Sequence, residues 1–253
     1  MKVLITGASS GIGLEMAYYM ARQGHELILV ARREKRLQCI KSKIGSNVEI
    51  FECDLTNTNN VYDLYDKVKN KNVDILINNA GFGLFGNFWE TSLDRELEMI
   101  DLNIKAYHIL TKLFLKDFVK KDSGYILNVC SSAGFMSGPE LNTYYATKNY
   151  VTKLTFGIFE ELRSIKSNVV VSALCPGPVD TEFNKIANGD FMTKSLSAKY
   201  VSKYAIDKMF KRKLIIIPGI GTKIGLILVR LVPTKVSLRF IHAIQRKKQR
   251  TIK

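Results

Sequence analysis

The fold is decided by a short stretch near the amino end, KVLITGASSGIG, residues Lys2–Gly13. The apolar run Lys2–Thr6 has the composition of a buried β-strand, and the amphipathic stretch Ile12–Gln23 follows the glycines as a predicted helix. Glycines in a strand-to-helix turn let the backbone approach a pyrophosphate, which the free N–H groups of the new helix can bind. The stretch therefore predicts a βα unit that holds a nucleotide.

The spacing of these glycines is Gly-x3-Gly-x-Gly, whereas the usual dinucleotide fingerprint is Gly-x-Gly-x-x-Gly. Taken alone, the motif also fits a glycine-rich turn in any α/β protein. The rest of the chain has to decide between these two interpretations.

Short apolar runs and amphipathic stretches alternate along the chain. The runs are rich in Val, Ile and Leu and mostly continuous, which is typical of strands buried on both faces. The predicted strands are Lys2–Thr6, Glu26–Val30, Val48–Cys53, Asp74–Ile77, Tyr125–Cys130, Val169–Leu174 and Leu214–Ile217, and the predicted helices are Ile12–Gln23, Arg33–Ser42, Asn59–Asn70, Leu93–Lys120 and Tyr144–Ser164. This order predicts one Rossmann-like, doubly wound α/β domain with a mostly parallel seven-stranded sheet and helices on both faces.

The domain is expected to cover residues 1–221, with residues 222–253 as a basic amphipathic extension rather than an independent domain. The chain carries a net charge of +15, and residues 201–253 hold 14 Lys/Arg against one acid, Asp207, so 13 of the 15 net charges lie there. Two short helices split at Pro233, Ile224–Val232 and Val236–Ile244, are predicted in the extension. Three interpretations remain open. The extension can pack on its own or a neighbouring subunit, lie on an anionic membrane surface, or bind nucleic acid, for which only the charge argues.

The four cysteines and three histidines show no cluster. The thiols are Cys39, Cys53, Cys130 and Cys175. Their scatter favours reduced thiols in a reducing cytosol and indicates no metal site. The first apolar run is too short for a signal peptide, and no stretch of 18 apolar residues is present to span a membrane, so a cytoplasmic location is expected.

The end of the second strand, Leu29–Arg33, indicates which nicotinamide cofactor would bind. An acid usually stands there and binds the adenosine ribose hydroxyls, but Ala31 cannot accept their hydrogens. Arg32, with Arg33 and Ser9, can instead hold a ribose 2′-phosphate, which favours NADP(H) over NAD(H). The alternative is that both arginines simply begin a solvated helix.

Tyr144 and Lys148 are four residues apart in the predicted helix Tyr144–Ser164, and Ser131 precedes Tyr144 by thirteen residues. Residues four apart lie on one face of a helix, so an ammonium would stand beside a phenol and lower its pKa. A tyrosine of this kind can exchange a proton near neutral pH. The pair alone is weak, because many helices carry one by chance.

Five ordered motifs together resemble the short-chain dehydrogenase/reductase family, and more loosely a bacterial NADP-linked subgroup. The resemblance covers roughly residues 1–220. Its motifs are the glycine turn Thr6–Gly13, the sequence NNAG at Asn78–Gly81, Asn103, the set Ser131, Tyr144 and Lys148, and the PG motif at Pro176–Thr181.

The resemblance implies roles for four catalytic residues. Tyr144 would pass a proton to the substrate oxygen as hydride reaches the carbon, and Lys148 would lower the Tyr144 pKa and hold the nicotinamide ribose. Ser131 would hydrogen-bond the same oxygen, which gains negative charge during reduction. Asn103 would fix a water that links Lys148 to solvent.

The expected cofactor-binding set combines these motifs with the end of the second strand. Asp54 would touch the adenine, and Val179 and Thr181 would contact the nicotinamide amide. The full set is Gly7, Ser9, Ser10, Gly11, Ile12, Gly13, Arg32, Arg33, Asp54, Leu55, Asn79, Ala80, Gly81, Tyr144, Lys148, Pro176, Gly177, Val179 and Thr181.

Apolar side chains follow three of these motifs and predict a hydrophobic substrate pocket. The candidates are Phe82, Phe85, Phe88, Trp89, Phe135, Met136, Leu141 and Phe183, of which about half are expected to pack elsewhere or at a subunit interface. Residues Glu182–Ser197 are expected to form a mobile lid. Tyr145 and His108 are expected to pack, and Ser132 is the second choice to Ser131.

The sequence thus predicts an NADP(H)-dependent oxidoreductase that interconverts a carbonyl and an alcohol on a small hydrophobic substrate. The alternative is a catalytically silent NADP(H)-binding sensor or scaffold. The resemblance also implies a homodimer or homotetramer, formed through the helices Leu93–Lys120 and Tyr144–Ser164.

Overall fold

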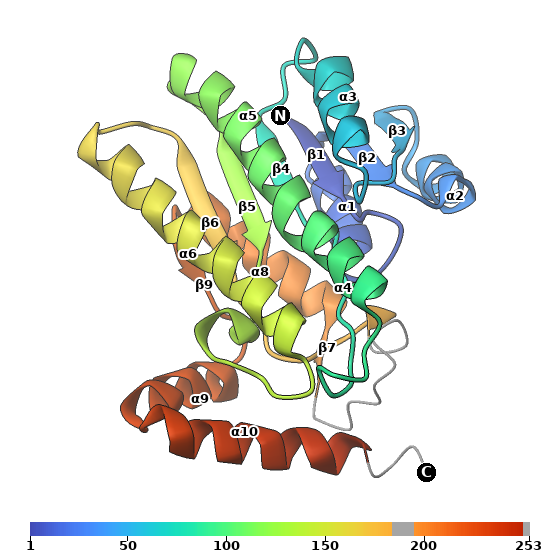
Figure 1. Ribbon diagram of the computed structural model, residues 1–253. Helices are drawn as coiled ribbons and strands as arrows, with labels where there is room; N and C mark the ends of the chain where they lie inside the picture. Colours follow the sequence, from blue (N-terminus) through green and yellow to red (C-terminus); the bar gives the residue numbers. More distant parts are fainter. Residues whose placement is uncertain (184–194, 250–253) are drawn as a thin grey trace.

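The structure is a computed structural model that describes residues 1–183 and 195–249 of the 253-residue chain. A seven-stranded, wholly parallel sheet crosses its centre (Figure 1) in the order β3-β2-β1-β4-β5-β6-β9. The strands are β1 Lys2–Thr6, β2 Glu26–Ala31, β3 Val48–Glu52, β4 Ile75–Asn78, β5 Tyr125–Val129, β6 Val170–Leu174 and β9 Ile215–Ile216. The order reverses between β1 and β4, and in such sheets ligands bind beyond the carboxyl ends of the strands at this point.

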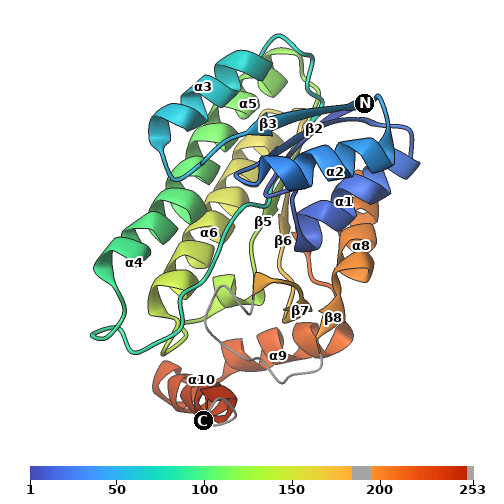
Figure 2. The ribbon, with the colours of Figure 1, turned by 90° about the vertical axis from the view of Figure 1, so that its right-hand side faces the viewer.

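Helices cover both faces of the sheet (Figure 2). One face carries α1 Gly11–Arg22, α2 Glu34–Ile44 and α8 Ala198–Phe210, and the other carries α3 Thr58–Val68, α4 Leu93–Ile100, α5 Tyr107–Lys120 and α6 Asn142–Ser164. Strand β1 shows why the sheet needs both layers. Val3 and Ile5 pack into the core beneath α1 and α8, while Leu4 packs on the α3 and α5 side, as the alternation of side chains along a strand requires.

Smaller elements surround the carboxyl ends of the strands. They are the π-helix η1 Asp101–Ala106, the 3₁₀-helix η2 Ser132–Phe135, the short parallel pair β7 Val179–Asp180 and β8 Leu196–Ser197, and the helices α9 Ile220–Leu231 and α10 Thr234–Gln249. Helices α9 and α10 lie at the end of the molecule toward which the strands point (Figures 1 and 2). No helix in the described part of the chain is long and apolar enough to cross a bilayer.

The predicted fold class is confirmed. All seven predicted strands occur, each within two residues of its predicted ends. The helix predicted over Leu93–Lys120 is continuous but contains the π-helical segment η1, which the apolar periodicity does not reveal. Helix α8 was not predicted, and α9 begins four residues before the predicted Ile224.

Candidate active site

The carboxyl ends of the strands border a cavity of about 370 Å³. Every residue of the predicted cofactor-binding set lines this cavity except Gly13. Of the predicted catalytic residues, Ser131, Tyr144 and Lys148 line it, and Asn103 lies fully buried outside the lining. The structure thus brings together predicted residues from seven separate segments of the sequence, although their individual roles stay predictions.

The glycine turn has a shape that only glycine fits. Gly7 and Gly11 have positive φ angles of 64° and 56°, a region that side chains with a Cβ seldom adopt. A Cβ at Gly13 would stand 2.4 Å from Asn79 Nδ2. Asn79 in turn donates hydrogen bonds from Nδ2 to the carbonyls of Thr6 (3.0 Å) and Gly7 (3.2 Å). The NNAG segment therefore holds the turn in place, and the bare glycine backbone leaves room for a pyrophosphate.

Arg33 forms several hydrogen bonds and an ion pair at the end of the cavity where a 2′-phosphate was predicted. Its guanidinium donates to Ser9 Oγ from Nε (3.2 Å) and Nη2 (2.9 Å), and from Nη2 to Ser10 Oγ at 2.8 Å. Its Nη1 forms an ion pair of 2.9 Å with Glu182. Arg32 also lines the cavity but is exposed. Arg32 was expected to be the main phosphate ligand. Because Arg33 bonds the two serines directly, we now predict that Arg33 has this role.

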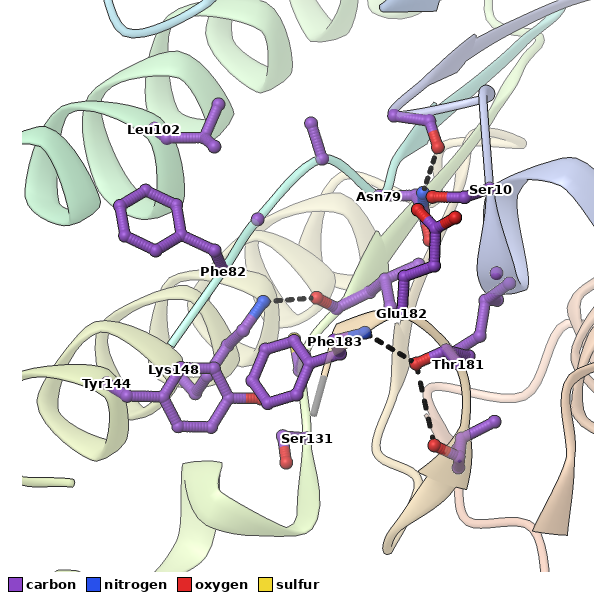
Figure 3. A pocket seen from close by; sticks show the side chains of 18 of the residues that line it. Ser10, Asn79, Phe82, Leu102, Ser131, Tyr144, Lys148, Thr181, Glu182 and Phe183 are labelled. Carbon is purple, nitrogen blue, oxygen red and sulfur yellow. Dashed lines mark hydrogen bonds between the residues drawn. The ribbon is translucent and has the colours of Figure 1, made fainter. Parts of the chain in front are cut away.

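Helix α6 presents Tyr144 and Lys148 one turn apart toward the cavity (Figure 3). Lys148 is buried and donates a hydrogen bond of 2.9 Å to the backbone carbonyl of Val129 at the end of β5. Its Nζ lies 5.8 Å from the centre of the Tyr144 ring. Ser131 caps η2 by accepting a hydrogen bond from the Ala133 N–H, which fixes the start of that turn. The end of β5 and helix α6 thus position the three groups.

Burial sets the proton affinities of the pair. It raises the pKa of the Tyr144 phenol well above its usual range, and a hydrogen bond with the Ser131 side chain acts in the opposite direction. It also lowers the pKa of the Lys148 ammonium to about 8. The expected lowering of the Tyr144 pKa by Lys148 is therefore not found. Burial is the largest cause of the Tyr144 shift, and the Lys148 ammonium is bonded to the Val129 carbonyl and lies over the Tyr144 ring.

Asn103 lies in the π-helix η1 and is fully buried. Its Nδ2 donates to the Phe82 carbonyl (2.9 Å) and to Thr147 Oγ1 (3.1 Å), and its Oδ1 accepts from the Phe82 N–H (3.2 Å). The side chain thereby ties the loop after β4 to helix α6, next to Lys148. π-Helical turns of this kind are frequent at functional sites. The proposed water link between Asn103 and Lys148 stays a prediction.

The substrate side of the cavity contains three of the eight predicted apolar side chains, fewer than the half that was expected. Phe82, Leu141 and Phe183 line it, while Phe88 and Trp89 are exposed at 60% and 80%. Phe85, Phe135 and Met136 are not among the lining residues. The predicted lid falls largely on residues 184–194, which lie outside the described residues; its first two, Glu182 and Phe183, line the cavity.

Three polar or aromatic lining residues were missed: Arg95, Tyr145 and Gln245. Tyr145 was expected to pack, and its ring does pack beside Tyr144, at 6.1 Å between ring centres, but it also lines the cavity. Gln245 Nε2 donates to the Tyr145 hydroxyl at 3.1 Å. No local pattern signals a contact between residues 100 positions apart, since only the docking of α10 produces it.

Comparison with known proteins identifies the family of the chain. The family model described as short chain dehydrogenase matches residues 1–190. The chain belongs to the short-chain dehydrogenase family. An NADP-dependent 3-hydroxy acid dehydrogenase of Escherichia coli is 33% identical over 190 residues, which cover 74% of this chain and 76% of that protein.

Two solved structures of the short-chain dehydrogenase family have similar folds. A short-chain dehydrogenase from Sphingobium yanoikuyae in complex with NADPH shares 31% identity at a TM-score of 0.82, with 89% of this chain and 94% of that chain covered. A short-chain dehydrogenase/reductase from Burkholderia phymatum in complex with NAD shares 25% identity at the same TM-score, with 90% and 92% covered. The chain is accordingly an oxidoreductase of the short-chain dehydrogenase type, and of these two similar structures one is a complex with NADPH and the other a complex with NAD.

Proposed function

We propose that this protein is an NADP(H)-dependent oxidoreductase that interconverts a carbonyl and an alcohol on a small hydrophobic substrate, with Tyr144 as the acid and base. The observation that carries the proposal is the convergence of Tyr144, Ser131 and Lys148 on one cavity whose other end holds Arg33 and the glycine turn. The bare glycine backbone and the arginine donors fit a phosphorylated dinucleotide.

The raised pKa of Tyr144 suits a proton donor in reduction, because the phenol keeps its proton at neutral pH. When bound, the nicotinamide cofactor would supply the hydride that adds to the carbonyl carbon. The Tyr144 hydroxyl gives its proton to the carbonyl oxygen and is left as a phenolate. Ser131 stabilises the charge that develops on that oxygen. Lys148 supplies positive charge near the phenolate until a proton returns, and its proposed second role is to hold the cofactor ribose.

The apolar part of the cavity supports a hydrophobic substrate. Phe82, Leu102, Leu141 and Phe183 line it, and the Phe183 ring lies 5.2 Å from the Tyr144 ring. Apolar walls with a few convergent polar groups are typical of small-molecule sites. Phe183 comes from the segment after Pro176–Thr181, so the same loop borders the cofactor side and the substrate side.

A panel of ketones and aldehydes tests the proposal directly, with NADPH oxidation followed at neutral pH. At least one apolar carbonyl compound should be reduced with multiple turnovers. If NADPH binds and no compound of the panel is turned over, the site is that of a silent cofactor-binding protein.

The catalytic domain is proposed to span residues 1–221, with 222–253 as an extension of it. Exposed apolar residues on and before α4, Trp89, Leu93 and Leu97, support a homodimer or homotetramer through the α4–α6 face. Light scattering on wild type and Leu93→Asp would show whether this face holds subunits together: a lower mass for the variant supports it, and equal masses exclude it.

A further inference from the structure

Helices α9 and α10 lie across the end of the molecule toward which the strands point (Figures 1 and 2), and Gln245 of α10 lines the cavity. Their inner sides are anchored on the domain. Leu226 and Ile241 are buried, and Gln245 is 2% exposed and bonds Tyr145 in the cavity wall. His242 Nε2 lies 3.5 Å from the buried carboxylate of Glu140. The extension is therefore seated in one orientation, which fixes what its outer side presents.

The outer side of the two helices is apolar. The exposed apolar residues of α9 are Ile220, Ile224, Ile227, Leu228 and Leu231. Their spacing of 4, 3, 1 and 3 positions puts them on one helical face, opposite the buried Leu226. Val236 and Phe240 are four apart in α10. We call these residues the outer apolar face: Ile220, Ile224, Ile227, Leu228, Leu231, Val232, Val236 and Phe240. The outer face of a surface helix is normally polar, so a run of this size indicates a contact surface.

Cations flank the outer apolar face, and acids are absent. Lys223, Lys235, Arg239 and Arg246 are exposed, and none of them has an ion-pair partner among the described residues. The sequence holds no Asp or Glu after Asp207. Apolar residues beside unpaired cations are the composition of a helix that lies in the interface of a bilayer with anionic lipids.

We propose that α9 and α10 form a membrane-docking surface, with the outer apolar face in the interfacial region of an anionic bilayer and the flanking cations against lipid headgroups. Charge decides between this partner and a second copy of the chain. Symmetric pairing would press two strongly basic segments together with no acid of the segment to neutralise them, whereas anionic headgroups provide the complementary charge.

The docking surface also bears on the substrate, and this step rests on the proposed function. Helix α10 turns Phe240 outward and Gln245 into the cavity lining. Gln245 Oε1 is buried and has no hydrogen-bond partner among the described residues, so it can accept a hydrogen bond from a ligand. A docked enzyme would hold its cavity directly above the lipid surface. The substrate class that fits is a membrane-dissolved carbonyl compound that also carries a hydrogen-bond donor.

Sedimentation of the full chain with vesicles tests the docking. Wild type should sediment with vesicles of phosphatidylcholine mixed with phosphatidylserine, and not with phosphatidylcholine alone. Reversing two flanking charges in Lys235→Glu/Arg239→Glu should weaken binding about a hundredfold. The matched control Lys43→Glu/Lys67→Glu makes the same charge change on exposed residues of α2 and α3 and should bind within about threefold of wild type.

The contribution of the outer apolar face to vesicle binding is tested by substituting two isoleucines of similar exposure, Ile227 at 60% and Ile165 at 63%. Ile227→Asp should lose vesicle binding, and Ile165→Asp, at the end of α6, should keep it. Failure of wild type to bind the anionic vesicles, or equal losses in face and control variants, would overturn the proposal. So would light scattering that shows Ile227→Asp separating an oligomer while its vesicle binding is intact.

The substrate step has its own readout. A long-chain ketone dispersed in the anionic vesicles should be reduced more slowly by Lys235→Glu/Arg239→Glu than by wild type, while a water-soluble ketone is reduced equally by both. Equal rates on the vesicle-bound ketone would refute the delivery of substrate from the membrane. If no ketone is reduced by any form, the proposed function fails, and vesicle binding still decides the docking.

Discussion

Glu182 forms an ion pair with Arg33 across the end of the cavity, with 2.9 Å between Oε2 and Nη1. Its other oxygen lies 2.6 Å from Arg36. Hydrogen bonds from Arg36 and then Arg33 lower the pKa of Glu182 to about 2, so this carboxylate is ionised throughout the physiological range. A negative group of the protein thus occupies a donor of the arginine that is proposed to bind the 2′-phosphate.

Glu182→Gln is expected to tighten NADPH binding by about two- to fivefold, because the phosphate no longer competes with a carboxylate for Arg33. The gain is small since both partners are more than a third exposed and such pairs contribute up to about 1 kcal/mol. Isothermal titration with NADPH and NADH checks this, and NADH affinity should not change. Glu34→Gln removes an acid of α2 that has no such contact and is the control. Weaker NADPH binding by Glu182→Gln would show that Glu182 orients Arg33 for the cofactor rather than competing with it.

Arg33→Ala is expected to weaken NADPH binding by about ten- to a hundredfold, the usual cost of a charge-assisted hydrogen bond to a phosphate. Arg32→Ala should also weaken the binding of NADPH more than that of NADH, and the loss should be smaller than in Arg33→Ala if Arg33 is the main ligand. NADH should bind nearly as well to either variant as to wild type. Titration of both cofactors gives the comparison, and equal losses for NADPH and NADH would remove the phosphate assignment.

The rate of carbonyl reduction is expected to fall as the pH rises through about 8. Burial lowers the pKa of Lys148 to about 8, so the ammonium loses its charge there while the Tyr144 phenol, whose pKa is raised, stays protonated. A profile of kcat/KM against pH measures this. In Lys148→Arg any remaining activity should be insensitive to pH over the same range, because the guanidinium does not titrate. A wild-type profile that stays level well above pH 8 would exclude Lys148 as the titrating group.

Lys148→Met is expected to make the folded protein more stable at pH 7 while abolishing activity. The folded pKa of about 8 lies below the ordinary 10.5, so burying the charged form costs about 3 kcal/mol. This cost is fully present below pH 8 and disappears as the pH rises toward 10.5. The Val129 carbonyl keeps a partner, since the Tyr107 hydroxyl also donates to it at 3.2 Å. Urea unfolding should show that the variant is more stable than wild type at neutral pH and that the difference shrinks at alkaline pH. A variant less stable than wild type at pH 7 would contradict the cost assigned to Lys148.

Local patterns in the sequence predicted the architecture and most of the cavity. Continuous Val/Ile/Leu runs such as Ile75–Asn78 mark strands buried on both faces, and the carboxyl ends of parallel strands must meet at one edge. Gly7 lies at such a strand end, and Asn79 and Ser131 were assigned to the same site through the resemblance of their motifs to the short-chain dehydrogenase/reductase family. Helix geometry alone likewise predicted that Tyr144 and Lys148, four residues apart, lie on one face of a helix.

Features that depend on tertiary packing could not be predicted in this way. Gln245 reaches Tyr145 only because α10 folds back over the cavity. The direction of the Tyr144 pKa shift depends on how deeply the phenol is enclosed, which residue spacing does not report. Phe88 and Trp89 are large apolar residues like those that line the cavity, and only the course of the loop leaves them exposed.

Tyr144→Phe is the most direct test, because it removes one hydroxyl and leaves the ring that packs on Phe183. Single-turnover reduction of a ketone that the wild type accepts should slow by about a hundredfold or more, while NADPH affinity stays within about twofold of wild type. Tyr145→Phe, in the same cavity wall, should reduce the ketone at a rate close to wild type. A Tyr144→Phe protein that reduces the ketone as fast as wild type would contradict the assignment of Tyr144 as the proton donor.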